Sequence, residues 1–319
     1  MKLHLRIVVY RGGAYWKECW ESVKENLDLF DGVYISINQS ELQEEDIATV
    51  RDLRSDKIHL LCQEKYLTAT QHGIVMNNWL KKFHLDGYVY ILCHDDILVR
   101  EGLLELRAMP LQETDAVFCG AHFFSSDGSE VPDPSQEADY TFPVSPEKFV
   151  LIHGRLSLNI SRLVVPATLF HSKDVSSNAL QYGYWAELCY LCSPFIERIC
   201  ATVKPAVKVR VHNQSEGSFI APDLYLFDFI LFRMQLYPRF RSREIRTMAV
   251  TETFYMIRKH LFRGTYDFFL AWVRLTRLGY SRFTTGLEMA FYYVRHTVKR
   301  TMHRSFRKKE EEISAEEEL

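Results

Sequence analysis

Residues 88–96 read Tyr-Val-Tyr-Ile-Leu-Cys-His-Asp-Asp, so an apolar run of strand length ends in two adjacent carboxylates. Apolar, β-branched and aromatic residues suit a strand that is covered on both faces, whereas ionised carboxylates need water, a cation or a hydrogen-bond donor. The end of this strand is therefore predicted to bind a ligand. The alternative is ordinary turn chemistry, because Asp also ends many strands by bonding to the nearby backbone.

The composition is that of a globular protein. The chain has 319 residues, of which 47% are hydrophobic and 25% charged, which suffices for one large or two medium domains. Its seven scattered cysteines favour reduced thiols over a disulfide framework. The first residues are too charged for a secretory signal, and no stretch reaches the roughly 18 apolar residues of a spanning helix. We therefore expect an intracellular protein that does not span a membrane.

Strands and helices alternate along the first half of the chain. Strands separated by helices form β-α-β units and a mainly parallel sheet, whose ligands bind at the carboxyl ends of the strands. The polar loops at residues 11–13, 38–40 and 94–96 all follow such ends, and we call the edge where they should converge the rim. The periodicity predicts strands at residues 3–10, 32–37, 58–62, 88–93 and 115–124, and helices at 16–29, 68–83 and 103–109.

Several short segments follow one another in a characteristic order. They are an opening strand, loop and helix (6–13 and 19–23), a helix containing Gln-His-Gly-Ile (69–74), the strand end Cys-His-Asp-Asp (93–96), a strand at 162–170, a helix start containing Glu187 (184–188) and the run containing Arg210 and His212 (209–215). This order resembles that of the family 2 glycosyltransferases of the GT-A fold, of the bacterial cell-surface polysaccharide type, whose corresponding motifs are Asn-x-Gly-Ile, D-x-D-D, an acceptor-side strand, E-D and Arg-x-His. The resemblance covers about residues 3 to 220 and implies an α/β, GT-A-like sheet flanked by helices.

The resemblance also implies a nucleotide-sugar donor bound at the rim. Two residues depart from the family pattern: Asn38 stands where an Asp usually contacts the nucleobase, and Cys93 stands where D-x-D begins with Asp. An amide can still hydrogen-bond a base edge, so Asn38 remains a candidate. By this resemblance the donor-binding residues are Tyr10, Arg11, Asn38, Gln71, Asp95 and Asp96.

A diphosphate leaving group calls for a divalent cation, Mg²⁺ or Mn²⁺, held by one or two carboxylates. Because these hard cations prefer oxygen to sulfur, Asp95 is the candidate metal ligand in place of Cys93. His212, beside Arg210, is a second candidate ligand for the metal or the diphosphate. Two structural alternatives remain open: Asp96 could cap the helix that follows it, and His212 could be a satisfied structural residue.

Glu187 is the candidate catalytic base. The acceptor hydroxyl needs a positioned carboxylate to accept its proton, and Glu187 lies at the E-D helix start among several aromatic residues that would raise its pKa. The alternative is an exposed carboxylate that the helix dipole favours in a first turn. Asp174 is the second candidate for the base.

The last third of the chain is strongly basic. Residues 233–309 contain 18 Lys and Arg against four Asp and Glu, a net charge of +14, and residues 310–319 carry six Glu. Apolar stripes at helical spacing alternate with these cations, which is typical of amphipathic helices that bind anionic lipid. A packed helical subdomain, a homo-oligomer interface and a nucleic-acid surface are the alternatives. Nucleic acid is the least favoured, because no recognition motif is present.

These observations predict three segments and one function. Residues 1–221 form a GT-A-like catalytic domain, 222–309 a basic helical region for membrane association or interaction, and 310–319 an acidic disordered tail. The expected activity is inverting transfer of a sugar from a nucleotide diphosphate to a lipid-linked or growing glycan, on the cytoplasmic face of the cell membrane. A nucleotidyltransferase and a catalytically inactive scaffold of the same fold are the alternatives.

Overall fold

The computed structural model describes residues 1–132, 142–153, 159–171, 190–191, 193–212 and 244. All of them belong to one compact unit, Met1–Ile245. Within this described part of the chain, no helix is both long enough and apolar enough to cross a membrane. The predicted base Glu187, its substitute Asp174 and the segments 222–309 and 310–319 lie outside the described residues, so these interpretations stay predictions.

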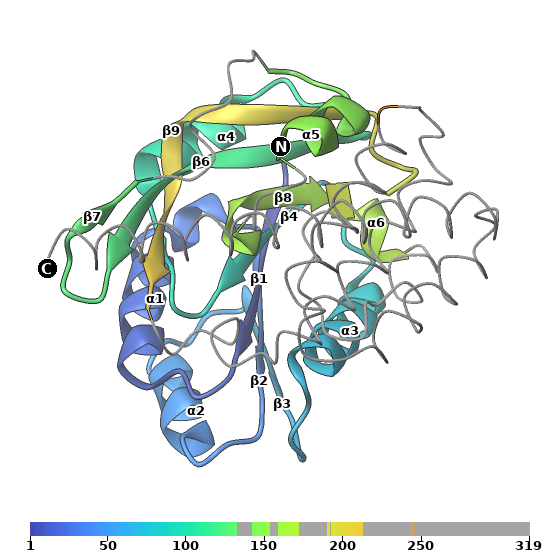
Figure 1. The fold of residues 1–319 in the computed structure, drawn as a ribbon. Helices are drawn as coiled ribbons and strands as arrows, with labels where there is room; N and C mark the ends of the chain where they lie inside the picture. The colour runs from blue at the N-terminus through green and yellow to red at the C-terminus, as the bar shows by residue number, and fades with distance from the viewer. Residues whose placement is uncertain (133–141, 154–158, 172–189, 192, 213–243, 245–319) are drawn as a thin grey trace, which may run out of the picture. The chain divides into compact units, whose positions relative to one another are not determined.

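The first four long strands form a parallel sheet in the order β3-β2-β1-β4 (Figure 1). β1 is central because it is apolar on one face and bonds to β2 and β4 along nearly its full length. The elements are β1 (Leu3–Val9), α1 (Gly13–Glu25), β2 (Gly32–Ile37), α2 (Gln43–Arg51), β3 (Ile58–Cys62), α3 (Ala69–Leu80) and β4 (Tyr88–Cys93), with short 3₁₀ helices at Leu27–Leu29 and Lys81–Phe83.

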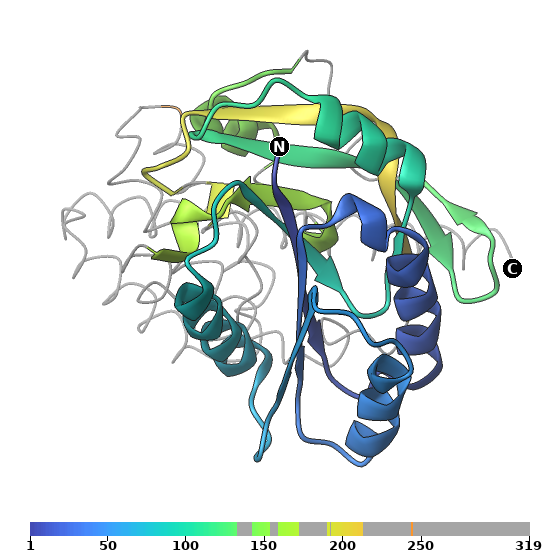
Figure 2. The same ribbon diagram turned by 180° about the vertical axis from the view of Figure 1, so that it is seen from behind.

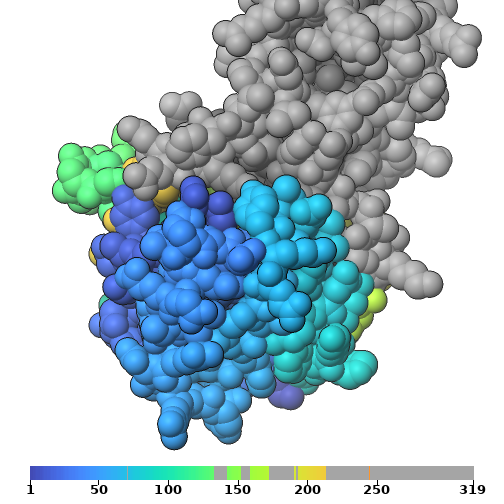
Figure 3. Space-filling view, turned by 90° about the horizontal axis from the view of Figure 1, so that it is seen from below, coloured from blue at the N-terminus to red at the C-terminus, as the bar shows by residue number. Residues whose placement is uncertain are grey.

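The sheet continues beyond β4 with mixed strand directions. β8 runs antiparallel to both β4 and β6, β9 is parallel to β6, and β5 and β7 pair antiparallel at the edges. Figure 3 shows the β6–β7 hairpin projecting from the body of the unit. The elements are β5 (Ile97–Leu98), α4 (Arg100–Ala108), β6 (Asp115–Ser125), β7 (Glu130–Val131), α5 (Pro146–His153), a 3₁₀ helix at Ile160–Arg162, β8 (Leu163–Pro166), α6 (Thr168–His171) and β9 (Arg198–Val211).

The predicted α/β sheet flanked by helices is confirmed, and the parallel pairing expected of its β-α-β units holds from β3 to β4. Two details differ from the prediction. α2 was not expected, because its sequence is mostly polar and buries only Asp46, Ile47 and Val50. The strand expected over residues 162–170 ends at Pro166, which has no N–H to continue the ladder, and α6 follows.

The two faces of the parallel sheet differ in chemistry. One face is apolar and packs against α1, α2 and α4, whereas α3 covers the opposite face (Figure 2). Trp16 and Trp20 of α1 are almost completely buried on the apolar side, and aromatic burial of this size dominates the stability of a core. The strand residues of the apolar face are Leu3, Leu5, Ile7 and Val9 of β1, Val33, Ile35 and Ile37 of β2, and Tyr88, Tyr90 and Leu92 of β4.

Asp46 of α2 fixes the turn that joins β1 to α1. Its fully buried carboxylate accepts hydrogen bonds from the backbone N–H groups of Gly12 (3.1 Å) and Gly13 (2.9 Å), and its carbonyl accepts one from the Trp16 indole (3.0 Å). The turn needs this support because Arg11 and Gly13 adopt the left-handed region, with φ of 51° and 50°. One carboxylate thus holds the first loop of the rim in place.

We predict that Asp46→Ala lowers the free energy of unfolding by about 2–4 kcal/mol, because it leaves the buried N–H of Gly12 and the half-buried N–H of Gly13 without an acceptor. Urea denaturation of the intact chain measures this change. Glu45→Ala is the matched control: Glu45 is the exposed neighbour and makes only a surface ion pair with Lys17, so we expect a change within about 0.5 kcal/mol. Equal effects of the two substitutions would contradict this role for Asp46.

Candidate functional site

The three polar loops meet at the rim, as the sequence predicts. Val8 of β1 pairs with Ser36 of β2 on one side and with Cys93 of β4 on the other, so the three strands end side by side. The backbone N–H of Asn38 then donates to the carbonyl of Val9 at 2.8 Å. The segments that begin at Tyr10, Asn38 and His94 are therefore neighbours in space.

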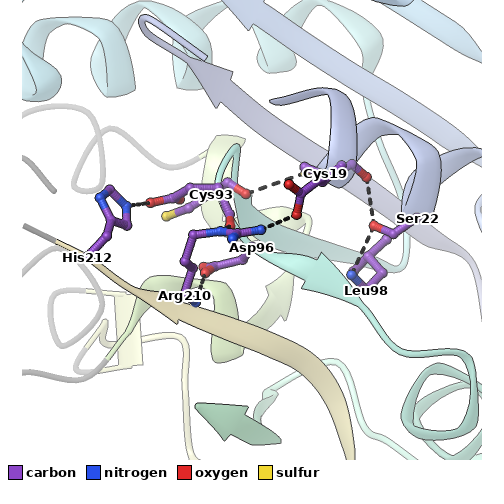
Figure 4. A network of polar contacts seen from close by, with 9 residues as sticks. Cys19, Ser22, Cys93, Asp96, Leu98, Arg210 and His212 are labelled. Atoms are coloured by element: carbon purple, nitrogen blue, oxygen red, sulfur yellow. Dashed lines mark hydrogen bonds and ion pairs between the residues drawn. The ribbon is translucent and has the colours of Figure 1, made fainter. Parts of the chain in front are cut away.

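Asp96 is a buried carboxyl group with one oxygen unsatisfied. Its side chain is 1% exposed, and Oδ1 accepts the backbone N–H of Arg210 at 2.8 Å (Figure 4). Oδ2 has no hydrogen-bond partner among the described residues. Burial and the charge of Asp95 raise the pKa of Asp96 well above its ordinary value, although the nearby Ser161 hydroxyl, the Arg210 amide and Asn159 oppose this shift. An unpaired oxygen at this depth needs either a proton or a cation.

Asp95 lies next to Asp96 but in a different environment. Its Oδ2 is 2.8 Å from Nε2 of His212 at the end of β9. Burial raises the pKa of Asp95, but the hydrogen bond with His212 and the positive potential of His94 and His212 outweigh it, so the pKa is lowered overall. The two carboxyl groups therefore differ: Asp95 is held as an anion, and Asp96 favours its neutral form in the protein alone.

Arg210 joins the rim to α1. Besides its backbone bond to Asp96, its Nε donates to the carbonyl of Asp95 at 3.1 Å and its guanidinium pairs with Glu18 of α1. The guanidinium also lies over the ring of Tyr15, 4.5 Å from its centroid, and the same ring lies 5.1 Å from His212. β9 thereby places two basic side chains against two acidic ones that are more than a hundred residues away in the chain.

The residues of the rim fit a divalent cation. Ligand atoms of Cys93, Asp95 and Asp96 lie within 4.8 Å of one another. Burial and the two carboxylates raise the pKa of the Cys93 thiol far above its ordinary value, so it stays protonated and is a poor ligand. Asp95 and the orphaned Oδ2 of Asp96 supply the hard oxygens that Mg²⁺ and Mn²⁺ prefer. His212 contacts Asp95 and is the remaining predicted ligand.

Two predicted donor-binding amides are engaged by the protein itself. Asn38 is 2% exposed; its Oδ1 accepts the N–H groups of Gln39 and Leu67, both at 3.0 Å, and its Nδ2 donates to the Leu67 carbonyl at 2.7 Å. Gln71 forms a capping box with Thr68 at the start of α3. Asn38 thus keeps a single N–H for a ligand, and both residues shape the loop at residues 63–68, so their donor-binding role remains a prediction.

Tyr10 and Arg11 lie on the open side of the rim. Tyr10 contacts Tyr66, with ring centroids 5.5 Å apart, and Arg11 lies over the Tyr10 ring and pairs with Glu41 at 2.9 Å. Tyr66 is 54% exposed, so part of its ring is open to solvent. Tyr66 was not predicted as a site residue, because it lies between strand and helix, outside every periodic segment.

Ser161 was also overlooked. Its hydroxyl accepts the backbone N–H of Cys93 at 2.8 Å, and it reaches β4 from the 3₁₀ helix that precedes β8. A single Ser in a polar segment gives no signal in a sequence, because Ser is common in turns. Only the antiparallel pairing of β8 with β4 brings this hydroxyl to the rim.

The electrostatics of Asp96 predict a pH dependence of stability for the ligand-free protein. Folding raises the pKa of this carboxyl group above the 3.8 that it has in the unfolded chain. Its contribution to the stability of the folded state is therefore fully present below pH 3.8 and is lost as the pH rises toward the pKa of the folded state. Asp96→Asn removes this loss and keeps Oδ1 for Arg210. Its free energy of unfolding should therefore exceed that of the wild type by more at pH 8 than at pH 5, by up to about 1.4 kcal/mol per pH unit between the two pKa values.

Urea denaturation at both pH values measures the difference, and Asp56→Asn on the exposed loop before β3 is the control. A stability difference between Asp96→Asn and the wild type that does not change with pH would contradict the raised pKa.

Comparison with known proteins agrees with this geometry. No family model and no curated protein sequence matches the chain. Solved structures do: the chain is similar to residues 1–349 of TarS from S. aureus in complex with UDP-GlcNAc, with a TM-score of 0.59, 14% identity, and coverage of 82% of this chain and 73% of that one. The same TarS fragment with UDP gives a TM-score of 0.53 at 15% identity, over 83% and 73% of the two chains. The chain therefore has the GT-A-type glycosyltransferase fold.

Proposed function

We propose that the protein is a nucleotide-sugar glycosyltransferase. One observation carries the proposal: two adjacent carboxyl groups at the end of β4, one ionised and one with a buried unpaired oxygen, lie at the rim of a GT-A-type fold. Ligands of such open sheets bind at the carboxyl ends of the strands. The similar TarS structures contain UDP-GlcNAc and UDP, which supports a uridine nucleotide as the first donor to test.

A divalent cation, Mg²⁺ or Mn²⁺, would be held by Asp95 and Asp96, with His212 beside them. When bound, it would neutralise the charge that develops on a diphosphate leaving group. In the protein alone, the hydrogen bond from His212 occupies Oδ2 of Asp95, so His212 orients this carboxylate and competes for it. Arg210 fixes the side chain of Asp96 through its amide and the backbone of Asp95 through its Nε. The chain thus positions its acidic oxygens before any ligand arrives.

The donor has a recognisable path across the rim. Tyr10 and the exposed Tyr66 offer an aromatic surface on which a nucleobase can stack. The diphosphate would then extend toward Asp95 and Asp96, and the sugar beyond them. Arg11 is balanced by Glu41, so it would contribute to the donor only by exchanging that surface partner.

The base, the acceptor and the cellular location belong to the same proposal. Glu187 accepts the proton of the acceptor hydroxyl, and the sugar is transferred with inversion to a glycan or glycolipid. The basic segment 222–309 binds the anionic inner face of the cell membrane, where such acceptors are built. The support for these points is the sequence resemblance and the net charge of +14 over residues 233–309.

Asp95→Asn tests the cation site. With Mn²⁺ present, UDP at 100 times its Kd should stabilise the wild type by about 2.7 kcal/mol, seen as a higher unfolding temperature. The variant should lose the metal-dependent part of this increase, because one charge is removed at nearly constant shape. Asp86→Asn, an exposed acid paired with Lys2 at the opposite edge of the sheet, should behave as the wild type. Full metal-dependent stabilisation of Asp95→Asn would remove Asp95 from the site.

Glu187→Gln tests the base. Release of nucleoside diphosphate from the donor sugar that stabilises the protein best should slow by about 100-fold or more, since general-base catalysis typically contributes that much. Donor affinity should change little, because the donor does not need the proton acceptor. Glu197→Gln, which changes an exposed glutamate immediately before β9, is the control. If Glu187→Gln keeps wild-type turnover, Asp174 becomes the candidate.

A further inference from the structure

The face of the sheet that α3 covers carries buried polar side chains among apolar ones, unlike its opposite face. Ser36 of β2 bonds to His72 of α3 at 2.8 Å and accepts the side-chain N–H of Gln63 at 2.9 Å. Asn77, one turn and a half further along α3, donates to the hydroxyl of Tyr190 at 2.8 Å. Buried polar groups of this kind specify one arrangement of helix and sheet only when their partners are satisfied.

Arg6 is the fixed charge of this layer. It projects from the centre of β1 toward α3 and is only 4% exposed. Burial, together with the positive charges of Arg6 and His94, lowers the pKa of His72 to about 4, so His72 is neutral near pH 7. A guanidinium stays protonated at every accessible pH. The layer between α3 and the sheet therefore contains a permanent cation among neutral groups.

Arg6 has no anionic partner in the described part of the chain. Its Nε donates to Oδ1 of Asn77 at 3.1 Å, and it makes no ion pair there. A buried cation without a counter-charge destabilises a folded protein, and an anionic ligand would remove that penalty. Arg162, a buried arginine of the 3₁₀ helix before β8, lies 3.9 Å from the Phe118 ring and bonds to the Cys119 carbonyl.

The free end of Arg6 faces the rim. α3 begins at the carboxyl end of the sheet, after the loop that Asn38 binds, and runs back toward the start of β4. Nε contacts Asn77, whereas Nη2 lies 3.6 Å from the position that a Cβ on Gly73 would occupy, one helical turn closer to the rim. Among the described residues, Nη2 is the only heavy atom within 4 Å of that position outside the helix backbone and the chain neighbours of Gly73, so no described side chain fills the place beside the guanidinium. The charge of Arg6 also reaches the rim, where it opposes the rise in the pKa of Cys93.

We propose that Arg6 and the space beside Gly73 form an anion subsite that binds phosphate oxygens of the donor's diphosphate from below the rim, opposite the cation held by Asp95 and Asp96. This inference rests on the proposed function, because it assigns the anion to a nucleotide. The two Nη groups of the guanidinium can donate to oxygen atoms there, and charge-assisted bonds of this type are about twice as strong as neutral ones. Arg6 is thereby a binding residue that was not among those predicted from the sequence.

Arg6→Gln separates this role from a structural one. The amide nitrogen of Gln follows Cβ, Cγ and Cδ, as Nε of Arg does, so the variant can keep the hydrogen bond to Asn77 while it loses the charge and both Nη groups. If Arg6 serves a ligand, the ligand-free variant should unfold at the same temperature as the wild type or higher, because an uncompensated charge is gone. If Arg6 only supports the fold, the unfolding temperature should fall.

The binding experiment uses the intact chain without divalent metal, titrated with inorganic pyrophosphate, UDP and uridine in a calorimeter. We expect Arg6→Gln to weaken pyrophosphate and UDP by about tenfold or more, as for the loss of charged hydrogen bonds, and to leave uridine unchanged. Arg100 lies at the start of α4 and forms an exposed ion pair with Asp28, so Arg100→Gln should change none of the three affinities.

The outcomes separate this inference from the proposed function. Equal affinities of the wild type and Arg6→Gln for UDP would overturn the anion subsite and leave the glycosyltransferase proposal unaffected. A wild type that binds neither UDP nor pyrophosphate, with or without Mn²⁺, would overturn both. Loss of pyrophosphate binding together with a lower unfolding temperature in Arg6→Gln would also count against the subsite. In that case Arg6→Lys, although it retains the charge, should restore neither the pyrophosphate binding nor the unfolding temperature.

Discussion

The arrangement of the rim depends on Arg210. Its amide, its Nε and its terminal nitrogen contact Asp96, Asp95 and Glu18 in turn, so one residue joins β9, the end of β4 and α1. Hydrogen bonds from both the backbone and the side chain of this one residue hold β9 beside the two acids. Because backbone and side chain both take part, the position of β9 and the electrostatics of the site are set together.

Much of the fold was predictable from the hydrophobic periodicity of the sequence and from the order of strands and helices along the chain. β1, β2 and β4 read as apolar runs of strand length, and the rim followed from the rule that parallel strands end on one edge. The family resemblance placed His212 at one metal site with Asp95, but strand periodicity could not, because 117 residues separate them and β9 reaches the rim by pairing with β6 and β5. α2 was missed for a different reason: its role is carried by one buried Asp, which has no periodic signal.

The same limit explains which site residues were found. Asp95 and Asp96 follow a buried strand, where a carboxylate is conspicuous, and the structure brings both to the rim. Asn38 also follows a strand, but its amide is largely occupied by the Leu67 backbone, a use that the sequence cannot distinguish from binding a base. Arg6 lies inside the first strand, and the sequence assigned no separate role to it, because the exposure of one residue in a strand depends on which helix covers that face.

In the described part of the ligand-free protein, two buried groups near the rim lack complementary partners. Asp96 is buried with an oxygen that lacks a donor, and Arg6 is buried without an anion in the described part of the chain. Each destabilises the fold by itself, and neither contacts the other. A metal-bound diphosphate has the complementary pattern, since its cation suits the carboxylates and its oxygens suit a guanidinium. Binding of the cation and of the diphosphate oxygens would satisfy both buried groups. The protein should therefore favour a ligand that carries both charges over one that carries a single charge.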